Sequence, residues 1–283
     1  MEDYLKSNEF QTLLNLALTE DIGGGDYTSL ACIEPGKKES AVMIAKEQGI
    51  IAGVELGEYI FNKVNSKLKV HCLKKDGDLV QVGDEIMKIS GDAVAILTAE
   101  RTVLNFMQRL SGVATTTNKV TQLLKGTNTK VLDTRKTTPA YRFLEKWAVK
   151  TGGGTNHRFG LYDMILIKDN HVDYAGGIIQ AIQNSVAYLK IQNLAIPIEI
   201  EVRSMMELES VMQVGKVDRI LLDNFTPKEV KEAVQLIGKR FITEASGGIT
   251  LDNCKAYADA GVDFISMGAI THSVKSLDLS LII

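Results

Sequence analysis

The feature that most constrains this chain is an alternation of short apolar runs and amphipathic segments in its second half. The apolar runs are at 130–133, 164–167, 197–202, 218–222, 240–243 and 262–267. The amphipathic segments are at 174–189, 205–212, 227–237 and 252–260. The last four apolar runs begin roughly 22 residues apart, which suits one strand and one helix each. Repeated βα units predict a parallel sheet, either closed as a barrel or open and doubly wound.

Residues of types that suit a binding or catalytic site lie at the end of every one of these predicted strands. They are 133–136, 168–171, Glu201, Asp223 with Asn224, 246–248 and Gly268. A barrel gathers all its strand ends around one mouth, whereas an open sheet gathers them only near a switch point. Because only six clear units are visible where a full barrel has eight, we expect an incomplete α/β barrel of about six to seven parallel strands.

The first hundred residues predict a smaller α+β region. An opening helix is expected at about 8–18, followed by apolar stretches at 41–54 and 67–89 that Gly-Asp pairs interrupt. From Ala99 onward, apolar residues return at helical spacing, which predicts a long helix between the two halves. The repeated Gly-Asp pattern at 76–87 is similar to half of a lipoyl or biotinyl carrier domain, but it has no modifiable lysine at a hairpin tip. Paired strands with Gly-Asp turns are therefore the favoured interpretation.

Charge and cysteine content exclude several classes of partner. With Lys+Arg 32 against Asp+Glu 35, the net charge of −3 gives no general attraction for nucleic acid or anionic lipid. Three widely spaced cysteines, Cys32, Cys72 and Cys254, fit neither a disulfide framework nor a zinc site. No apolar run approaches the roughly 18 residues of a membrane helix, and the opening MEDYLKSNEF lacks an apolar leader core. We expect a cytoplasmic protein that binds neither membrane nor nucleic acid.

Basic residues are concentrated between Val131 and Asp173. The pairs Arg135-Lys136 and His157-Arg158 lie in loops rich in Thr and Gly, where charged residues are disproportionately functional. Guanidinium groups bind carboxylates through paired hydrogen bonds, so these loops predict a site for a ligand with more than one carboxylate. By contrast, Arg142, Lys146 and Lys150 recur at helical spacing and predict a solvated helix face.

A second anion site is indicated at Ser246-Gly247-Gly248. The glycine pair is expected to open a helix whose N–H groups suit a phosphate, with a plain turn as the alternative. Glu201 and Asp223 end strands, where they could hold Mg²⁺, hydrogen-bond sugar hydroxyls or stabilise a developing cation. Glu199 shares a strand face with Glu201, and one of the two is a candidate to neutralise a neighbouring lysine.

The ordered series of motifs resembles the quinolinate phosphoribosyltransferase family, also called carboxylating nicotinate-nucleotide pyrophosphorylases. The motifs are EDIGGGDYTS at 20–29, ERTVLN at 100–105, LSGVAT at 110–115, DTRKTTP at 133–139, KTGGGTNHR at 150–158, IKDNH at 167–171, LLDNF at 221–225 and GAITHS at 268–273. The resemblance therefore extends over almost the whole chain.

The resemblance implies an enzyme with an open α/β sandwich domain at 1–110 and an incomplete barrel at 111–271. The C-terminal tail, about 272–283, is a candidate to return to the first domain. The implied reaction joins quinolinate to phosphoribosyl pyrophosphate, giving nicotinate mononucleotide, pyrophosphate and CO₂ for NAD synthesis. It also implies Mg²⁺ and a homodimer with shared active sites, or a higher oligomer.

The resemblance also implies a role for each matched residue. The residues implied to bind the two quinolinate carboxylates are Arg101, Arg135, His157, Arg158 and Lys168. Lys136 is implied to lie between the substrates. Glu201 and Asp223 lie by the ribose and are the candidate magnesium ligands, partly through water or substrate; with Lys136 they form the catalytic set. The residues implied to bind the phosphoribosyl and phosphate groups are Lys136, Lys168, Glu201, Asp223, Ser246, Gly247, Gly248, Gly268 and His272. Arg203 departs from the family pattern, which puts the charge around Glu201 in doubt.

Two alternatives remain open. One is a paralogue with an altered substrate, such as a molybdenum-transport-linked homologue or a nicotinate-using transferase, which would need fewer carboxylate contacts. The other is a non-catalytic phosphate-binding or carrier-type protein, although no matched cationic position is lost.

Overall fold

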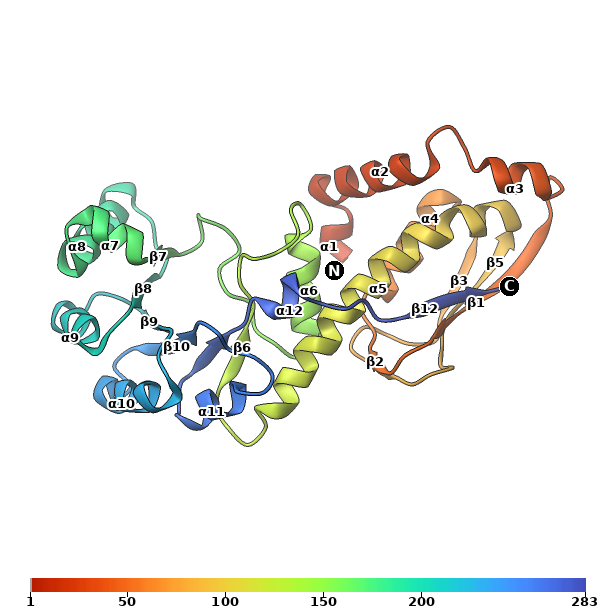
Figure 1. Ribbon diagram of the computed structural model, residues 1–283. Helices are drawn as coiled ribbons and strands as arrows, with labels where there is room; N and C mark the ends of the chain where they lie inside the picture. The colour runs from red at the N-terminus through yellow and green to blue at the C-terminus, as the bar shows by residue number, and fades with distance from the viewer. Residues whose placement is uncertain (1) are drawn as a thin grey trace. The chain divides into compact units, whose positions relative to one another are not determined.

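A computed structural model describes residues 2–283 (Figure 1). The chain forms two compact units, of which the first comprises the residues up to Thr116, Pro139–Gly152 and Val274–Ile283. The second unit comprises Thr117–Thr138 and Gly153–Ser273. Within the described range, no helix has the length and apolar character needed to cross a membrane.

The first unit is built on an antiparallel sheet in the order β12-β1-β5-β3. These strands are β1 (Lys38–Ala45), β3 (Lys69–Cys72), β5 (Glu85–Asp92) and β12 (Leu279–Ile282), and a separate pair joins β2 (Gly49–Ile50) to β4 (Leu79–Val80). Its helices are α1 (Glu2–Leu5), α2 (Asn8–Ile22), α3 (Tyr27–Cys32), α4 (Val54–Val64) and α6 (Arg142–Thr151). The C-terminal strand β12 pairs with β1, so the tail returns to the sheet of the first unit (Figure 1).

The Gly-Asp segment at 76–87 forms β4 and the start of β5. The two strands do not pair with each other, because β4 pairs with β2 and β5 lies between β1 and β3. Asp76 has a separate structural role: its Oδ1 accepts the N–H groups of Gly53 and Val54, at 2.7 and 2.9 Å. These contacts satisfy the amino terminus of α4, whose N-cap residue Gly53 has no side chain to do so.

The solvated helix face predicted at Arg142, Lys146 and Lys150 is wrong for Lys146. Lys150 is exposed, but Lys146 is 1% exposed and Glu145 is fully buried. Glu145 receives the guanidinium of Arg109 from α5 (Ala93–Leu123) at 2.7 Å. Helix α6 therefore packs this face inside the first unit, and a charged periodic stripe does not by itself reveal exposure.

The second unit contains a six-stranded parallel sheet in the order β6-β11-β10-β9-β8-β7. Its strands are β6 (Lys130–Leu132), β7 (Ile165–Ile167), β8 (Ile198–Val202), β9 (Arg219–Asp223), β10 (Ile242–Ser246) and β11 (Phe264–Ser266). Its helices are α7 (Asp169–Ala175), α8 (Ile178–Gln192), α9 (Met205–Val214), α10 (Pro227–Ile237), α11 (Cys254–Asp259) and α12 (Ala269–His272). The six predicted strands are confirmed.

The sheet is an incomplete barrel, with β6 and β7 at its two edges. A single parallel bridge between Leu132 and Thr155 extends the edge at β6. Every residue of β8 is buried, with Ile198, Ile200 and Val202 on one face and Glu199 and Glu201 on the other. The register places Ser246 opposite Asp223, so the carboxyl ends of β9 and β10 are level.

The glycine pair at 247–248 does not open a helix, contrary to the prediction. Helix α11 begins at Cys254. Gly247 and Gly248 have φ angles of +95° and +60°, which a right-handed helix does not contain. The pair instead forms a loop directly after β10.

Candidate active site

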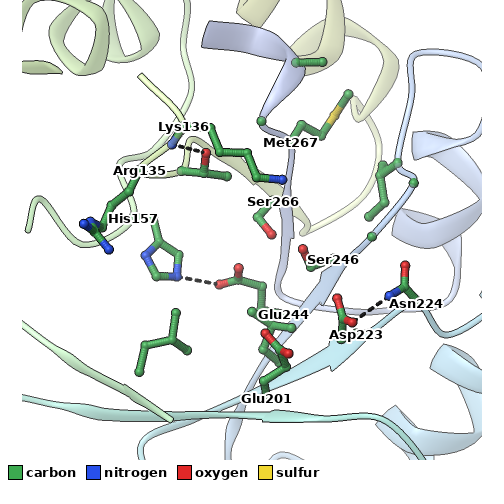
Figure 2. A pocket seen from close by; sticks show the side chains of 18 of the residues that line it. Arg135, Lys136, His157, Glu201, Asp223, Asn224, Glu244, Ser246, Ser266 and Met267 are labelled. Carbon is green, nitrogen blue, oxygen red and sulfur yellow. Dashed lines mark hydrogen bonds and ion pairs between the residues drawn. The ribbon is translucent and has the colours of Figure 1, made fainter. Parts of the chain in front are cut away.

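A pocket of about 600 Å³ lies at the carboxyl ends of the six parallel strands (Figure 2). All its lining residues belong to the second unit. Among the predicted site residues, those that line it are Arg135, Lys136, His157, Arg158, Lys168, Glu201, Asp223, Ser246, Gly247, Gly248, Gly268 and His272. Arg101, an exposed residue of α5 in the first unit, is not among the described lining residues.

One part of the pocket carries two guanidinium groups, that of Arg135 from the loop after β6 and that of Arg158 from the loop before β7. The carboxylate of Asp163 accepts the N–H groups of Phe159 and Gly160, at 2.6 and 2.9 Å. Arg158 is 9% exposed, and its guanidinium donates to the carbonyl of Met164 at 3.2 Å. Burial, and then the charge of Arg135, lowers the pKa of Arg158. The positive charges of the two guanidiniums repel each other, and a bound anion would offset that repulsion.

Lys136 extends into the same pocket from the loop after β6 (Figure 2). Its backbone is fixed on both sides: its N–H donates to Thr134 Oγ1 at 2.9 Å, and its carbonyl accepts Thr271 Oγ1 at 2.8 Å. A β-carbon at Gly268 would lie 3.0 Å from Lys136 Cδ. Gly268 therefore leaves the room through which the lysine side chain passes.

His157 lies at the floor of the pocket with both ring nitrogens facing protein groups. Its backbone N–H donates to buried Asp133 Oδ1 at 2.9 Å. Its Nδ1 accepts the backbone N–H of Arg158 at 2.7 Å. Its Nε2 lies 2.9 Å from Glu199 Oε2 and 3.5 Å from Glu244 Oε2.

Glu201 and Asp223 form the acidic part of the pocket. Lys168 Nζ lies 3.2 Å from Glu201 Oε2, so Glu201 is the member of its pair that neutralises a lysine, while Glu199 faces His157. Burial raises the pKa of Asp223, and the charge of Glu201 raises it further. The side-chain amide of Asn224 donates to Asp223 Oδ2 at 2.6 Å. Two carboxylates that repel each other at a pocket wall offer the hard oxygen ligands that a magnesium ion prefers.

A loop of unusual backbone conformation faces these acids. Asn224 has a φ of +58°, and its N–H donates to the carbonyl of Ser246 at 2.8 Å. A β-carbon at Gly247 would lie 2.9 Å from the backbone nitrogen of Asn224, so only glycine fits there. The loops after β9 and β10 are thus packed backbone against backbone at the edge of the pocket.

Arg203 does not enter the pocket lining. Its guanidinium lies 2.6 Å from Glu207 Oε1 and 3.4 Å from Asp173 Oδ1. Arg203 is thus paired with two acids that are not among the described lining residues of the pocket.

Sequence reasoning missed several lining residues. They are Leu166, Leu221, Glu244, Ile249, Thr250, Ser266, Met267 and Ala269. A signal existed for Glu244, which precedes Ser246 by two positions and so shares its strand face, as Glu199 shares that of Glu201.

An incomplete α/β barrel with cations, acids and a glycine loop at its strand ends defines an enzyme that acts on anionic substrates. Comparison with known sequences identifies the family. Residues 26–111 match the quinolinate phosphoribosyl transferase N-terminal domain, and residues 113–282 match the C-terminal domain of the same family. The chain belongs to the quinolinate phosphoribosyltransferase family.

Individual relatives agree along nearly the full length. The chain is 45% identical to a chloroplastic carboxylating nicotinate-nucleotide pyrophosphorylase of Arabidopsis thaliana, covering 96% of this chain and 82% of that protein. It is 42% identical to a probable carboxylating nicotinate-nucleotide pyrophosphorylase of Bacillus subtilis, covering 96% and 93%. The crystal structure of NadC from Streptococcus pyogenes superposes with a TM-score of 0.92 at 37% identity, covering 96% of this chain and 95% of that one.

Proposed function

We propose that this chain transfers the phosphoribosyl group of phosphoribosyl pyrophosphate to quinolinate, with decarboxylation, as a pentosyltransferase of NAD biosynthesis. The observation that carries the proposal is the pocket, in which Arg135, Arg158 and Lys168 face Glu201 and Asp223 within one set of strand ends. The products are nicotinate mononucleotide, pyrophosphate and CO₂.

Quinolinate carries two carboxylates, and phosphoribosyl pyrophosphate carries several more negative charges. The cationic residues offset this repulsion, so that the pyridine nitrogen can approach the anomeric carbon of the ribose. Arg135 and Arg158 bind the quinolinate carboxylates with Lys168, and His157 supports them from the pocket floor. Lys136 lies between the two substrates.

The ribose side of the pocket stabilises a developing positive charge. As the bond to pyrophosphate breaks, the ribose becomes oxocarbenium-like, and the carboxylates of Glu201 and Asp223 stabilise that charge. The loop residues Ser246, Gly247 and Gly248, together with Gly268 and His272, bind the 5′-phosphate. Lys168, paired with Glu201, holds that carboxylate in place.

Glu201 and Asp223 are the residues that would hold Mg²⁺, partly through water or substrate. When bound, Mg²⁺ offsets the negative charge of the leaving pyrophosphate. After transfer, the carbon–carbon bond to the carboxylate beside the ring nitrogen breaks and CO₂ leaves. The electron pair stays on the ring carbon, where the new cationic nitrogen stabilises it until a proton replaces CO₂, and we assign no dedicated general base to this step.

The proposed assembly is a homodimer, or a higher oligomer, in which Arg101 of one subunit completes the quinolinate site of another. The support is that Arg101 is exposed, lies upstream of every barrel strand and is absent from the described lining of its own pocket. The proposed compartment is the cytoplasm, which suits a chain whose three cysteines are all free thiols.

One assay tests the function and separates the rivals. Purified protein with Mg²⁺ is supplied with phosphoribosyl pyrophosphate and either quinolinate or nicotinate. The proposal predicts CO₂ release from quinolinate that depends on phosphoribosyl pyrophosphate, and no nucleotide from nicotinate. Nucleotide formation from nicotinate alone would favour the altered-substrate paralogue, and ligand binding without turnover would favour a binding protein.

A further inference from the structure

Two glutamates that the proposed reaction does not use lie buried beneath His157. Glu199 comes from β8 and Glu244 from β10, and both residues are fully buried. One carboxylate oxygen of each glutamate and one ring nitrogen of His157 all lie within 4.8 Å of one another. Figure 2 shows the imidazole of His157 directed toward Glu244.

The strand between them supplies a positive charge to this pair. Arg219 of β9 donates to Glu244 Oε2 at 2.8 Å, and its guanidinium lies 4.8 Å from the ring centroid of Phe264. Within the described residues, both carboxylate oxygens of Glu199 and Oε1 of Glu244 have no hydrogen-bond partner, so the 2.9 Å contact between Glu199 Oε2 and His157 Nε2 is an ion-pair contact. Leaving such oxygens buried and unsatisfied is costly, so packing alone does not explain why the chain carries two acids here.

A proton is available to reduce that cost. Burial, and then the charge of Glu199, raises the pKa of Glu244 to about 7. A carboxylic acid can donate to the neighbouring carboxylate, so two acceptors that face each other become one hydrogen-bonded pair.

The contacts of His157 show which of its ring nitrogens carries the proton. Nδ1 accepts the N–H of Arg158 at 2.7 Å, so Nδ1 is unprotonated and the ring proton is on Nε2. Nε2 is the atom that faces the two glutamates, at 2.9 and 3.5 Å. Without the two acids, the ring proton would no longer be favoured at Nε2. A proton on Nδ1 would break the contact to the backbone N–H of Arg158.

We propose that Glu199 and Glu244 are positioning residues: they hold His157 with its N–H at Nε2, and His157 in turn fixes the backbone of Arg158. This inference rests on the proposed function, because the group finally placed is the Arg158 guanidinium that binds a quinolinate carboxylate. Glu199 is not among the described lining residues of the pocket, whereas Glu244 is, and both acids contact His157, so we expect their effect on quinolinate affinity and not on the ribose side.

The same three side chains also have the chemistry of a metal site. Arg219 already supplies a full positive charge within 2.8 Å of Glu244, and a metal ion in that position would be repelled by it. A metal ion is therefore an outcome that the experiment must detect, and it would overturn the proposal.

The test measures binding of each substrate by calorimetry in wild type, Glu199→Ala, Glu244→Ala and Glu244→Gln. We expect each alanine variant to bind quinolinate at least about tenfold more weakly, as for loss of a charge-assisted contact worth about 1.4 kcal/mol. Phosphoribosyl pyrophosphate should bind within about twofold of wild type, well below a 1.4 kcal/mol effect. Glu244→Gln should retain more quinolinate affinity than Glu244→Ala, because the amide keeps a donor and an acceptor in place.

A spectroscopic measurement follows the tautomer directly. Nitrogen-15 NMR of histidine side chains should show His157 in the neutral Nε2–H form in wild type and an altered state in the alanine variants, with His71 unchanged. Asp263→Asn is the matched control: its carboxylate accepts from Thr243, which precedes Glu244 on β10, and Asp263 is not among the described pocket residues, so the variant should lose stability but not quinolinate affinity. If an alanine variant fails to fold, the Glu244→Gln spectrum carries the test, since it should still show Nε2–H.

Unchanged quinolinate affinity in the folded alanine variants would overturn the proposal, as would an Nδ1–H form of His157 in wild type. A stoichiometric metal ion that is lost in Glu199→Ala would also overturn it. Failure of the proposed function is distinguishable, because wild-type protein would then bind no quinolinate at all while the His157 tautomer remained measurable.

Discussion

The backbone of Gly247 passes so close to Asn224 that a β-carbon at Gly247 would lie 2.9 Å from the Asn224 backbone nitrogen. Gly247 also has a φ of +95°, a conformation that residues with side chains rarely adopt. The loop at 246–248, which we assign to the 5′-phosphate, and the loop that follows Asp223 are therefore shaped against each other.

We predict that Gly247→Ala weakens binding of phosphoribosyl pyrophosphate by at least about tenfold, or about 1.4 kcal/mol, because the alanine side chain must displace the neighbouring loop. Quinolinate binding should survive. Gly238→Ala is the matched control. Gly238 also has a positive φ, +58°, but it ends α10 and is not among the described residues of the pocket. Equal substrate affinities in the two variants would show that the loop shape has no role in binding.

Arg135→Ala should mainly abolish quinolinate binding. Loss of a charge-assisted bidentate contact costs on the order of 2–4 kcal/mol, so affinity should fall roughly 30- to 1000-fold. Calorimetry with folded protein measures this, with Arg240→Ala as the control, because Arg240 donates to the Ile237 carbonyl at the end of α10. Wild-type affinity in Arg135→Ala would exclude Arg135 from the quinolinate site.

Asp223→Asn should lower turnover and raise the Mg²⁺ concentration needed for half-maximal rate, because the variant lacks one negative charge beside the ribose. Quinolinate binding should persist. Asp218→Asn is the comparison: Asp218 accepts the N–H of Ile198 at 2.7 Å, before β9 begins. Normal turnover and normal Mg²⁺ dependence in Asp223→Asn would remove Asp223 from the catalytic set.

A subunit-mixing experiment tests whether Arg101 acts in a neighbouring subunit. Arg101→Ala and Lys136→Ala are each expected to be inactive. If Arg101 acts in trans, a mixed dimer regains one complete site, so random exchange restores roughly a quarter of all sites by symmetry. If subunits demonstrably exchange and activity stays at the background of the separate variants, Arg101 acts within its own chain.

The buried pair beneath His157 makes a prediction about stability and pH. Because the pKa of Glu244 is raised from 4.5 to about 7, the folded chain holds a proton that the unfolded chain releases in this range. This contribution is complete below about pH 4.5 and is lost as the pH rises toward 7. Denaturant titrations should show wild type losing stability relative to Glu244→Gln across that window. A difference that is constant from pH 4.5 to 7 would contradict the raised pKa.

The sequence predicted the six barrel strands because each is a short apolar run bounded by polar residues, a pattern that survives without knowledge of the partners. It did not predict where α11 begins, because Gly-Gly is compatible with both a helix start and a left-handed loop, and only the packing against Asn224 decides. The pairing of β4 with β2 was equally hidden, since strand pairing depends on contacts distant in sequence.

Most of the candidate pocket was predictable because its residues follow strands in loops. Glu244 shares a strand face with Ser246, but its burial and that of Lys146 were not predictable, because a charge inside a strand or on a helix face gives no sign of its burial until the partner elements are placed. Arg101 remains a prediction that needs a second subunit.

The central claim is that this pocket joins quinolinate to phosphoribosyl pyrophosphate and removes one carboxylate. Quinolinate labelled in the carboxyl group beside the ring nitrogen, mixed with phosphoribosyl pyrophosphate, Mg²⁺ and excess protein, tests it in a single turnover. We predict one labelled CO₂ and one pyrophosphate for each nicotinate mononucleotide formed. Pyrophosphate release with the label retained in the nucleotide, or no nucleotide at all, would contradict the account.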